Sequence, residues 1–182
     1  MENKNTHKKF ENSNKNILEG FDPISNENCK ILILGTMPGA ESLRQQQYYA
    51  YRMNQFWRLI FEIFKLPLTE NYEVKKKVIL EERIALWDVL KNCERKDSSD
   101  SNIKVPVAND FNQLFENLPK LEYICFNGKE AEKLYRKLVL GKSHEDQVTE
   151  DRFQYIGFPS TSPANTIKYE EKLQVWKKLL DL

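Results

Sequence analysis

Two short segments, far apart in the chain, each follow an apolar run of strand-like residues. Gly35-Thr36-Met37-Pro38-Gly39 comes directly after residues 30–34, and Phe158-Pro159-Ser160-Thr161-Ser162-Pro163-Ala164-Asn165 comes after residues 153–157. Both precede helix-like stretches, so we expect them at the carboxyl ends of strands in an open α/β sheet, where such folds bind ligands. Gly35 and Gly39 leave the backbone of the first segment free of side-chain bulk, and Pro38 fixes one φ angle within it. The N–H groups of this segment can therefore face a ligand. The two segments are expected to face each other across one cleft.

Aromatic and amide side chains lie between these segments, in Tyr48-Tyr49 and in Asn54-Gln55-Phe56-Trp57. Asn54 stands where a helix-like stretch begins, and an asparagine there commonly caps the free N–H groups of the first turn. A neutral amide is no strong base, but its carbonyl oxygen can hold a water molecule. Capping and water positioning both remain open for Asn54.

Together these segments resemble the uracil-DNA glycosylase superfamily, and most closely its hypoxanthine (deoxyinosine) DNA glycosylase branch. The resemblance covers roughly residues 28 to 180 and depends on the whole set, since Gly-x-x-Pro-Gly alone is a weak signal. It implies an enzyme that hydrolyses the N-glycosidic bond of a deaminated base, preferentially hypoxanthine. The substrate would be duplex DNA, with the nucleotide flipped out of the helix, and no metal or organic cofactor would be needed.

The resemblance also implies roles for individual residues. Many relatives hold an Asn or Asp that orients the attacking water at the position of Met37, and methionine has no strong donor or acceptor, so Asn54 is the expected catalytic residue. In mismatch-specific uracil glycosylases the equivalent of Phe56 stacks on the extruded base, although a core position beside Trp57 is the alternative. The residues expected to bind the base are Thr36, Met37, Gly39, Tyr49, Phe56 and Asp88.

Asp88 follows the strand-like run 84–87, where uracil-cleaving relatives often place an Asn that reads the edge of the base. An ionised carboxylate accepts a hydrogen bond but cannot donate one. Hypoxanthine presents an N1–H donor where adenine presents a bare N1 acceptor. An ionised Asp88 is therefore expected to accept from hypoxanthine and to reject adenine, and the alternative is a solvated Asp that caps a loop.

The rear segment offers hydroxyl and N–H groups on a loop stiffened by two prolines, which suits phosphate contacts that do not read sequence. A generic Ser-Thr-Pro loop is the alternative. Several relatives have a His immediately before Pro-Ser, where this chain has Phe158, and its only histidines are His7 and His144. Backbone N–H groups or Asn54 are therefore expected to stabilise the leaving base. The residues expected to contact DNA are Ser160, Thr161, Ser162, Ala164, Asn165 and Lys129.

Strand-like and helix-like apolar patterns alternate along the chain. Strands are expected at 31–34, 84–87, 121–126 and 153–157, and helices from 54 to the stop at Pro67, at 72–82 and 109–118, after Gly128, and at 167–180. This order predicts a three-layer α/β/α sandwich around a short, mostly parallel sheet of four strands. The polar segment 88–109 is expected to be a long loop that covers the cleft, and residues 141–151 a charged surface loop.

Composition limits the class of protein less than the motifs do. The chain has 182 residues and a net charge of +1, so we expect one domain over residues 17–182 after a disordered polar tail at 1–16, with no global signal for or against DNA. Three scattered cysteines fit reduced thiols in the cytoplasm and are too few for the four-cysteine iron–sulfur cluster of some relatives. We expect a monomer that is soluble and unexported, with no metal site and no membrane segment.

Three alternatives remain open at this stage. The same fold can act on uracil or thymine mismatches, because the preference of the pocket depends on few side chains. The protein can also be a catalytically weak DNA-damage binder, since Met37 and Phe158 replace residues that relatives use in catalysis. A nucleotide-handling α/β protein is the third alternative, although the chain has no Walker-type glycine-rich loop and no evident acidic metal cluster.

Overall fold

Four parallel strands form the central sheet, in the spatial order β3-β2-β6-β7. They are β3 (Ile84–Asp88), β2 (Ile31–Gly35), β6 (Tyr123–Asn127) and β7 (Gln154–Phe158). The computed structural model describes residues 17–142 and 152–182, so the expected tail at 1–16 and nearly all of the expected loop at 141–151 lie outside the described residues. The predicted α/β class and the parallel four-stranded sheet are confirmed.

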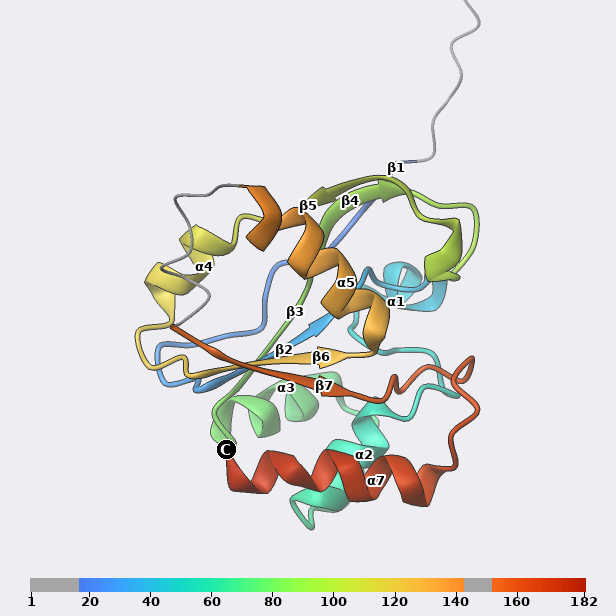
Figure 1. Cartoon of the computed structure of the whole chain (residues 1–182). Helices are drawn as coiled ribbons and strands as arrows, with labels where there is room; N and C mark the ends of the chain where they lie inside the picture. Colours follow the sequence, from blue (N-terminus) through green and yellow to red (C-terminus); the bar gives the residue numbers. More distant parts are fainter. Residues whose placement is uncertain (1–16, 143–151) are drawn as a thin grey trace, which may run out of the picture.

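Helices cover both faces of this sheet, as in a three-layer sandwich. Figure 1 shows α2, α3 and α7 on one face and α4 and α5 on the other. The α-helices are α1 (Ala40–Gln45), α2 (Phe56–Ile63), α3 (Tyr72–Glu81), α4 (Phe111–Asn117), α5 (Lys129–Leu138) and α7 (Tyr169–Trp176). Short 3-10 turns are η1 (Asp100–Asn102), η2 (Leu140–Lys142) and η3 (Lys177–Asp181). The predicted final helix at 167–180 is thus α7 continued by η3.

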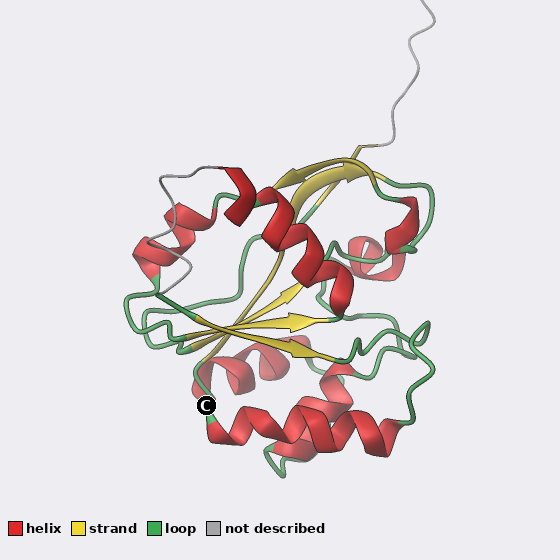
Figure 2. Ribbon diagram, in the orientation of Figure 1, coloured by secondary structure: helices red, strands yellow, loops and turns green. Residues whose placement is uncertain are grey.

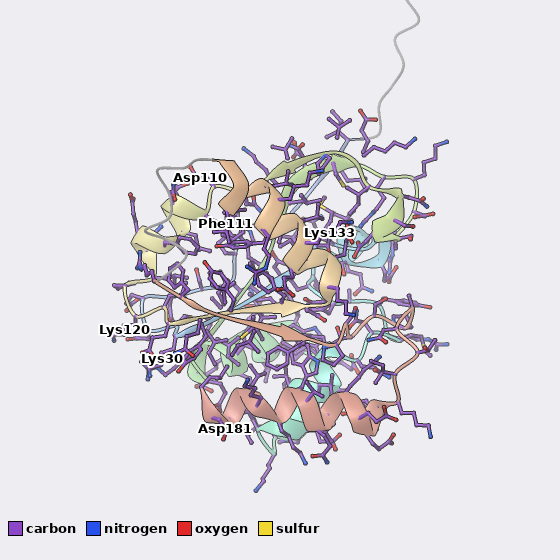
Figure 3. All side chains as sticks on the ribbon, in the orientation of Figure 1. Lys30, Asp110, Phe111, Lys120, Lys133 and Asp181 are labelled. Carbon is purple, nitrogen blue, oxygen red and sulfur yellow. The ribbon has the colours of Figure 1, made fainter. Side chains whose placement is uncertain are left out.

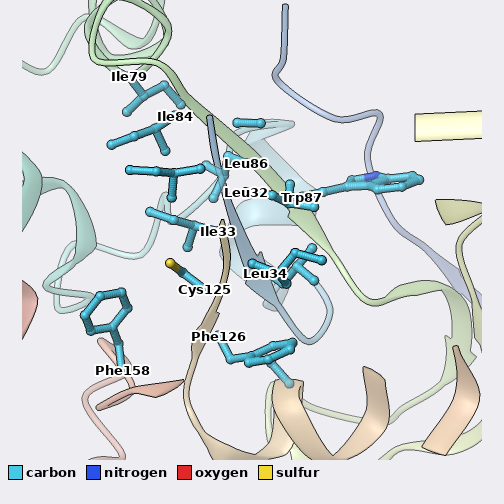
Figure 4. Close-up of a cluster of buried hydrophobic side chains, with 14 of the residues drawn as sticks. Leu32, Ile33, Leu34, Ile79, Ile84, Leu86, Trp87, Cys125, Phe126 and Phe158 are labelled. Atoms are coloured by element: carbon cyan, nitrogen blue, oxygen red, sulfur yellow. The ribbon is translucent and has the colours of Figure 1, made fainter. Parts of the chain in front are cut away.

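The core is built around β2, whose residues are all buried. Because successive side chains of a strand point to opposite faces, Ile33 pairs with Cys125 on one face, and Leu34 pairs with Phe126 on the other. Figure 4 shows these side chains between the flanking strands and helices. A strand that is apolar at every position must be covered on both faces, which explains the central place of β2.

The strand register brings the ends of neighbouring strands level with one another. Gly35, the last residue of β2, pairs with Asp88 at the end of β3, and Asn127 pairs with Phe158 at the ends of β6 and β7. The opposite edge, where the strands begin, is closed by polar surface contacts such as the ion pair of Lys30 with Glu122 at 3.2 Å. Figure 3 shows Lys30 and Lys120 at that edge, at the other end of the strands from the segments that follow them.

A second sheet was not predicted, and here the expectation of a long loop over residues 88–109 is wrong. Its strands are β1 (Ile17–Glu19), β4 (Leu90–Glu94) and β5 (Lys104–Ala108), which pair antiparallel in the order β1-β4-β5. Figure 2 shows these strands apart from the parallel sheet. The polar composition misled the prediction because β4 has only two buried residues, Leu90 and Cys93, with exposed Lys91 and partly buried Asn92 between them. The pairing of β4 with β5 is irregular at Asn92, so β4 lacks the regular alternation of apolar and polar residues that marks a half-covered strand.

Within the described residues, no helix is both long enough and apolar enough to cross a membrane.

Candidate active site

A cleft of about 1140 Å³ opens at the carboxyl ends of the parallel strands. It brings together most of the residues expected to act, namely Thr36, Met37, Gly39, Tyr49, Asn54, Asp88, Ser160, Thr161, Ser162, Ala164 and Asn165. The front and rear segments therefore lie across one cleft, as the sequence predicts. The volume exceeds the roughly 300–1,000 Å³ of typical small-molecule pockets, which suits a piece of a larger substrate.

The first segment is held against the neighbouring strands by its own backbone. The N–H of Val89 donates to the carbonyl of Gly35 at 2.9 Å, and the N–H of Leu90 donates to the carbonyl of Thr36 at 3.1 Å. A Cβ atom at Gly35 would collide with the Asp88 carboxyl group. Glycine is therefore required at this position for Asp88 to lie beside the first segment.

Asp88 lies in the wall of the cleft with only 4% of its surface exposed, and its Oδ2 atom has no hydrogen-bond partner among the described residues. Burial, followed by the negative charge of Asp100, raises the pKa of Asp88 to about 8, and the Arg95 guanidinium opposes this shift. The neutral acid therefore predominates near pH 7 in the unliganded protein. The raised pKa argues against the expected ionised carboxylate, because water is excluded from the group, and the role of Asp88 in reading the base stays a prediction.

Of the two aromatic residues expected to bind the base, Tyr49 borders the cleft and Phe56 does not. Their rings are stacked with centroids 4.0 Å apart, and Tyr49 lines the cleft whereas Phe56 is fully buried behind it. Edge contacts from Trp57 and Trp176 enclose Phe56 further. The structure does not bring Phe56 to the cleft, so the expectation that it stacks directly on a base is contradicted. Tyr49 has a positive φ of 53°, an uncommon conformation for a residue other than glycine.

Asn54 lies half-buried at the cleft, just before α2. Its Oδ1 atom accepts a hydrogen bond from the N–H of Phe56 at 3.0 Å, so Asn54 satisfies one free N–H of the first turn, although the N-cap residue itself is Gln55. An amide oxygen has two lone pairs and can accept from a water molecule at the same time. Its amide nitrogen donates to no described residue. Capping and water positioning are therefore compatible at Asn54.

The rear segment folds on its own serine side chains. Ser160 Oγ accepts from the N–H of Ser162 at 3.2 Å, and Ser162 Oγ accepts from the N–H of Ala164 at 3.3 Å. The Asn165 side chain donates to the carbonyl of Ser160 at 2.9 Å. These contacts leave the hydroxyl protons of both serines available to a strand. Thr161 is different, because it is fully buried, and the expectation that it contacts DNA through its side chain is contradicted.

Asn127, at the end of β6, is a further residue of the site. Its Nδ2 atom donates to the Tyr49 hydroxyl and to Thr161 Oγ1, both at 2.9 Å, and its Oδ1 atom accepts from the N–H of Thr161 at 2.9 Å. This one amide therefore connects the aromatic wall of the cleft to the rear segment. Its place at a strand end next to Gly128 was the available signal.

Lys129 lies outside the cleft, exposed at the first turn of α5. It follows Gly128, whose φ of 102° and close approach to the Ser160 side chain leave no room for a Cβ atom. The expected phosphate contact of Lys129 therefore stays a prediction.

Arg95, which follows β4, is a second residue that no sequence signal marked. Its side chain is 1% exposed, it donates to the carbonyl of Pro38, and its Nη1 atom lies 3.7 Å from Asp100 Oδ1. The Thr36 hydroxyl donates to the same Asp100 carboxylate. Arg95 and Asp100 thus hold the first segment against the second sheet.

Serines in the connection between β4 and β5 border the cleft on the same side as Asp100. Ser98 Oγ accepts from the N–H of Ala40 at 2.9 Å, and Ser98, Ser99, Asp100 and Ser101 all line the cleft. The segment expected to cover the cleft does border it, although it does so from an antiparallel hairpin. Among the described residues, no group of three or more His, Cys, Asp or Glu side chains could hold a metal ion.

A model of the uracil DNA glycosylase superfamily matches residues 23–180, and the chain therefore belongs to this superfamily. Two relatives from Methanosarcina acetivorans and Methanosarcina barkeri are both named hypoxanthine DNA glycosylase, the branch that the sequence resembles. The first is 40% identical over 88% of this chain and 96% of the relative. The second is 36% identical over 71% of this chain and 82% of the relative.

The fold is also similar to a solution NMR structure of a Methanosarcina acetivorans protein described as a candidate uracil DNA glycosylase. The TM-score is 0.72 at 38% identity, with 90% of this chain and 99% of that chain covered. The family expected from the sequence is confirmed by these comparisons.

Proposed function

We propose that this protein is a DNA glycosylase that hydrolyses the N-glycosidic bond of hypoxanthine in DNA. The observation that carries this proposal is the cleft itself, in which an aromatic ring, a buried carboxyl group and an amide converge at the ends of parallel strands. These groups are Tyr49, Asp88 and Asn54. The relatives named hypoxanthine DNA glycosylase support hypoxanthine as the base.

The substrate is proposed to be duplex DNA that carries a deaminated base, bound by one monomer. A base inside a duplex cannot reach a buried carboxyl group, so the nucleotide has to leave the stack and enter the cleft. Tyr49 lines the cleft and is partly exposed, and its ring is proposed to offer the flipped base a stacking surface worth about 1–3 kcal/mol. Thr36, Met37 and Gly39 border the same space.

The strand is proposed to lie over the rear segment, where Ser160 and Ser162 offer hydroxyl groups that contact phosphates without reading sequence. Asn54 is proposed to hold the attacking water through its carbonyl oxygen. A neutral amide is a sufficient water holder if the glycosidic bond breaks first and the sugar becomes an oxocarbenium-like electrophile. No residue then needs to act as a strong base.

The test is a panel of matched duplexes, each with one hypoxanthine, uracil, xanthine or thymine lesion, assayed for base release in single turnover. The expected result is release of hypoxanthine at the highest rate and no release from an undamaged duplex. Preferred release of uracil or thymine would assign the same fold to mismatched pyrimidines instead. Binding of the lesion duplexes without any release would identify a damage-binding protein and would overturn the proposal.

A further inference from the structure

Asp88 is a buried acid in the wall of a cleft that is otherwise open to water. It ends β3, is 4% exposed, and its Oδ2 atom finds no hydrogen-bond partner among the described residues. An unpaired polar atom at such a depth costs about 1–3 kcal/mol. The missing side chain of Gly35 creates the space that the carboxyl group occupies. A group kept at this cost beside a proposed base pocket points to a partner that arrives with the substrate.

The charged and titratable groups around Asp88 come from four parts of the fold. Burial is the largest cause of the raised pKa of Asp88. The negative charge of Asp100 in η1 raises this pKa further and Arg95 after β4 lowers it, which gives a pKa of about 8. Tyr48, Tyr49 and Tyr72 lie around the same carboxyl group; burial is the largest cause that raises the pKa of each phenol, and the charge of Asp88 raises it further. These phenols remain neutral at ordinary pH, so Asp88 is the group in this cluster that titrates between pH 7 and 9.

Departure of the base creates a negative charge that some group has to stabilise. The described residues 17–142 and 152–182 contain no histidine. Among the four charged residues that line the cleft, Glu41, Arg52 and Asp100 are not fully buried, whereas Asp88 is. A donor acts most strongly on a developing charge where water is excluded. Asp88 is the described acidic side chain that meets this condition.

We propose that the Asp88 carboxyl group is the general acid of the reaction and donates its proton to the carbonyl oxygen of the flipped base. This inference rests on the proposed glycosylase function. As the bond between C1′ and the base nitrogen breaks, both bonding electrons go to the base, and the Asp88 proton moves to its O6 oxygen. The base departs as the neutral enol tautomer and Asp88 is left as a carboxylate. Water adds to C1′ and its surplus proton restores the acid.

The acid also accounts for a chemical preference of the site. Hypoxanthine carries a carbonyl oxygen at C6 that gains negative charge as the base leaves. Adenine carries an amino group at C6, which is not an acceptor for the proton of Asp88. Neutral Asp88 can accept from N1–H through one oxygen while the other donates to O6. Discrimination against adenine then arises during bond cleavage, in place of the repulsion expected from an ionised carboxylate.

The experiment measures single-turnover release of hypoxanthine from a duplex between pH 6 and 10, with wild type, Asp88→Asn and Asp100→Asn. Wild type is expected to show a constant rate at low pH and a tenfold fall per pH unit above a break near pH 8. Asp88→Asn is expected to lose this break and to be about 10²-fold slower at pH 7, because an amide can donate a hydrogen bond but cannot transfer a proton. Any break that persists in Asp88→Asn belongs to the substrate or to another group.

Asp100→Asn keeps the acid but also weakens the contacts of Asp100 with Thr36 and Arg95, so its readout is the pH of the break and not the absolute rate. Removing the negative charge of Asp100 lowers the pKa of Asp88, so the break is expected to move to lower pH. This variant tests the inference even if Asp88→Asn fails to fold, which melting curves will show. An unchanged rate and break in Asp88→Asn, or an unmoved break in Asp100→Asn, overturns the general acid while leaving the glycosylase intact. Absence of base release by wild type overturns the proposed function, and this inference with it.

Discussion

The two sheets of this protein contribute to the cleft in different ways. The parallel sheet ends its strands at Gly35, Asp88, Asn127 and Phe158, so the segments that follow these residues reach the proposed substrate directly. The antiparallel sheet contributes mainly the connection between β4 and β5, which holds the first segment from outside through Arg95. The segments after the parallel strands are proposed to perform the chemistry, and the connection between β4 and β5 is proposed to keep the first of these segments in place.

This difference has a physical basis. The ends of parallel strands lie side by side at one edge, so short loops from distant parts of the sequence converge there. An antiparallel hairpin instead returns along itself, and its turn reaches only one neighbour. If the division is correct, substitutions on the parallel side change the rate of base release most, and substitutions on the antiparallel side change stability and positioning.

The largest effect on rate is expected for Asn54→Ala, in the connection that leaves β2. Loss of a preorganised polar contact should lower single-turnover base release by about 10²–10³. The lost capping contact to the N–H of Phe56 should lower the free energy of unfolding by about 1 kcal/mol. Base release and thermal unfolding of the same preparation measure the two effects separately.

Asn71→Ala is the matched control for Asn54→Ala. Asn71 caps α3 by accepting from the N–H groups of Glu73 and Val74, and it is exposed away from the cleft. It should cost similar stability and leave base release unchanged. Equal losses of rate in the two variants would show that Asn54 is only a cap, and the parallel side would lose its catalytic residue.

A smaller effect on rate, but a larger one on stability, is expected for Arg95→Met. Arg95 is buried, but the side chain of its partner Asp100 is 40% exposed, so water partly solvates the carboxylate left behind, and the lost ion pair and hydrogen bond together cost about 1–3 kcal/mol. The first segment also loses the contact to the carbonyl of Pro38, and we expect base release to slow about tenfold as this segment shifts. Chemical denaturation and single-turnover rates provide the measurements.

The double variant Arg95→Met with Asp100→Asn tests the origin of that loss. Neutralising Asp100 removes the unpaired carboxylate, so part of the stability should return. Arg95→Met alone should also move the pH break of base release upward, since the guanidinium lowers the pKa of Asp88. An unchanged melting temperature together with an unchanged rate would contradict the supporting role of the antiparallel region.

The sequence reveals these two regions unequally, for reasons visible in particular residues. The run Ile31 to Leu34 is apolar throughout because both faces are covered, so strand, class and sheet position could be predicted. β5 contains Pro106, is largely exposed and pairs with β4 through an irregular register, so its short-range pattern is weak. The second sheet was missed for this reason.

Within the site, residues that act through their place in a strand could be predicted, and those that act through tertiary contacts could not. Asp88 was found because it ends a strand, but its protonation depends on burial and on Asp100, which lies in a different element. Nothing in the order of Tyr49 and Phe56 along the chain tells which ring faces the cleft. Arg95 contacts a carbonyl that lies 57 residues away in sequence, and no local pattern records such a contact.

The stability of the protein should also depend on pH through Asp88, because its folded pKa of about 8 lies above the ordinary carboxyl value of 3.8. A raised carboxyl pKa means that the folded state holds a proton that the unfolded state releases, so this stabilisation is complete below about pH 4 and is lost as the pH rises toward 8. Asp88→Asn removes this dependence. Its free energy of unfolding should therefore fall less than that of wild type between pH 5 and 8, as urea denaturation at each pH will show.

The smallest effect is expected for the rear segment, where Ser160→Ala with Ser162→Ala removes two hydroxyl groups without changing any charge. Each lost hydrogen bond is worth about 0.5–1.5 kcal/mol, so binding of every lesion duplex should weaken by about tenfold, with the same factor for each base. Lys129→Ala, at the neighbouring start of α5, should instead reduce the salt dependence of binding by about one phosphate contact.

Ser101→Ala makes the comparison with the antiparallel side. The Ser101 hydroxyl is paired with that of Ser99 at 2.8 Å and lies next to Asp100, whose carboxylate disfavours a phosphate. Binding should therefore change by less than about twofold. If Ser101→Ala weakens binding as much as the rear-segment variant, the strand also runs over the antiparallel side. If the rear-segment loss is confined to one lesion, Ser160 and Ser162 belong to the base pocket, and the separation of strand holding from base recognition fails.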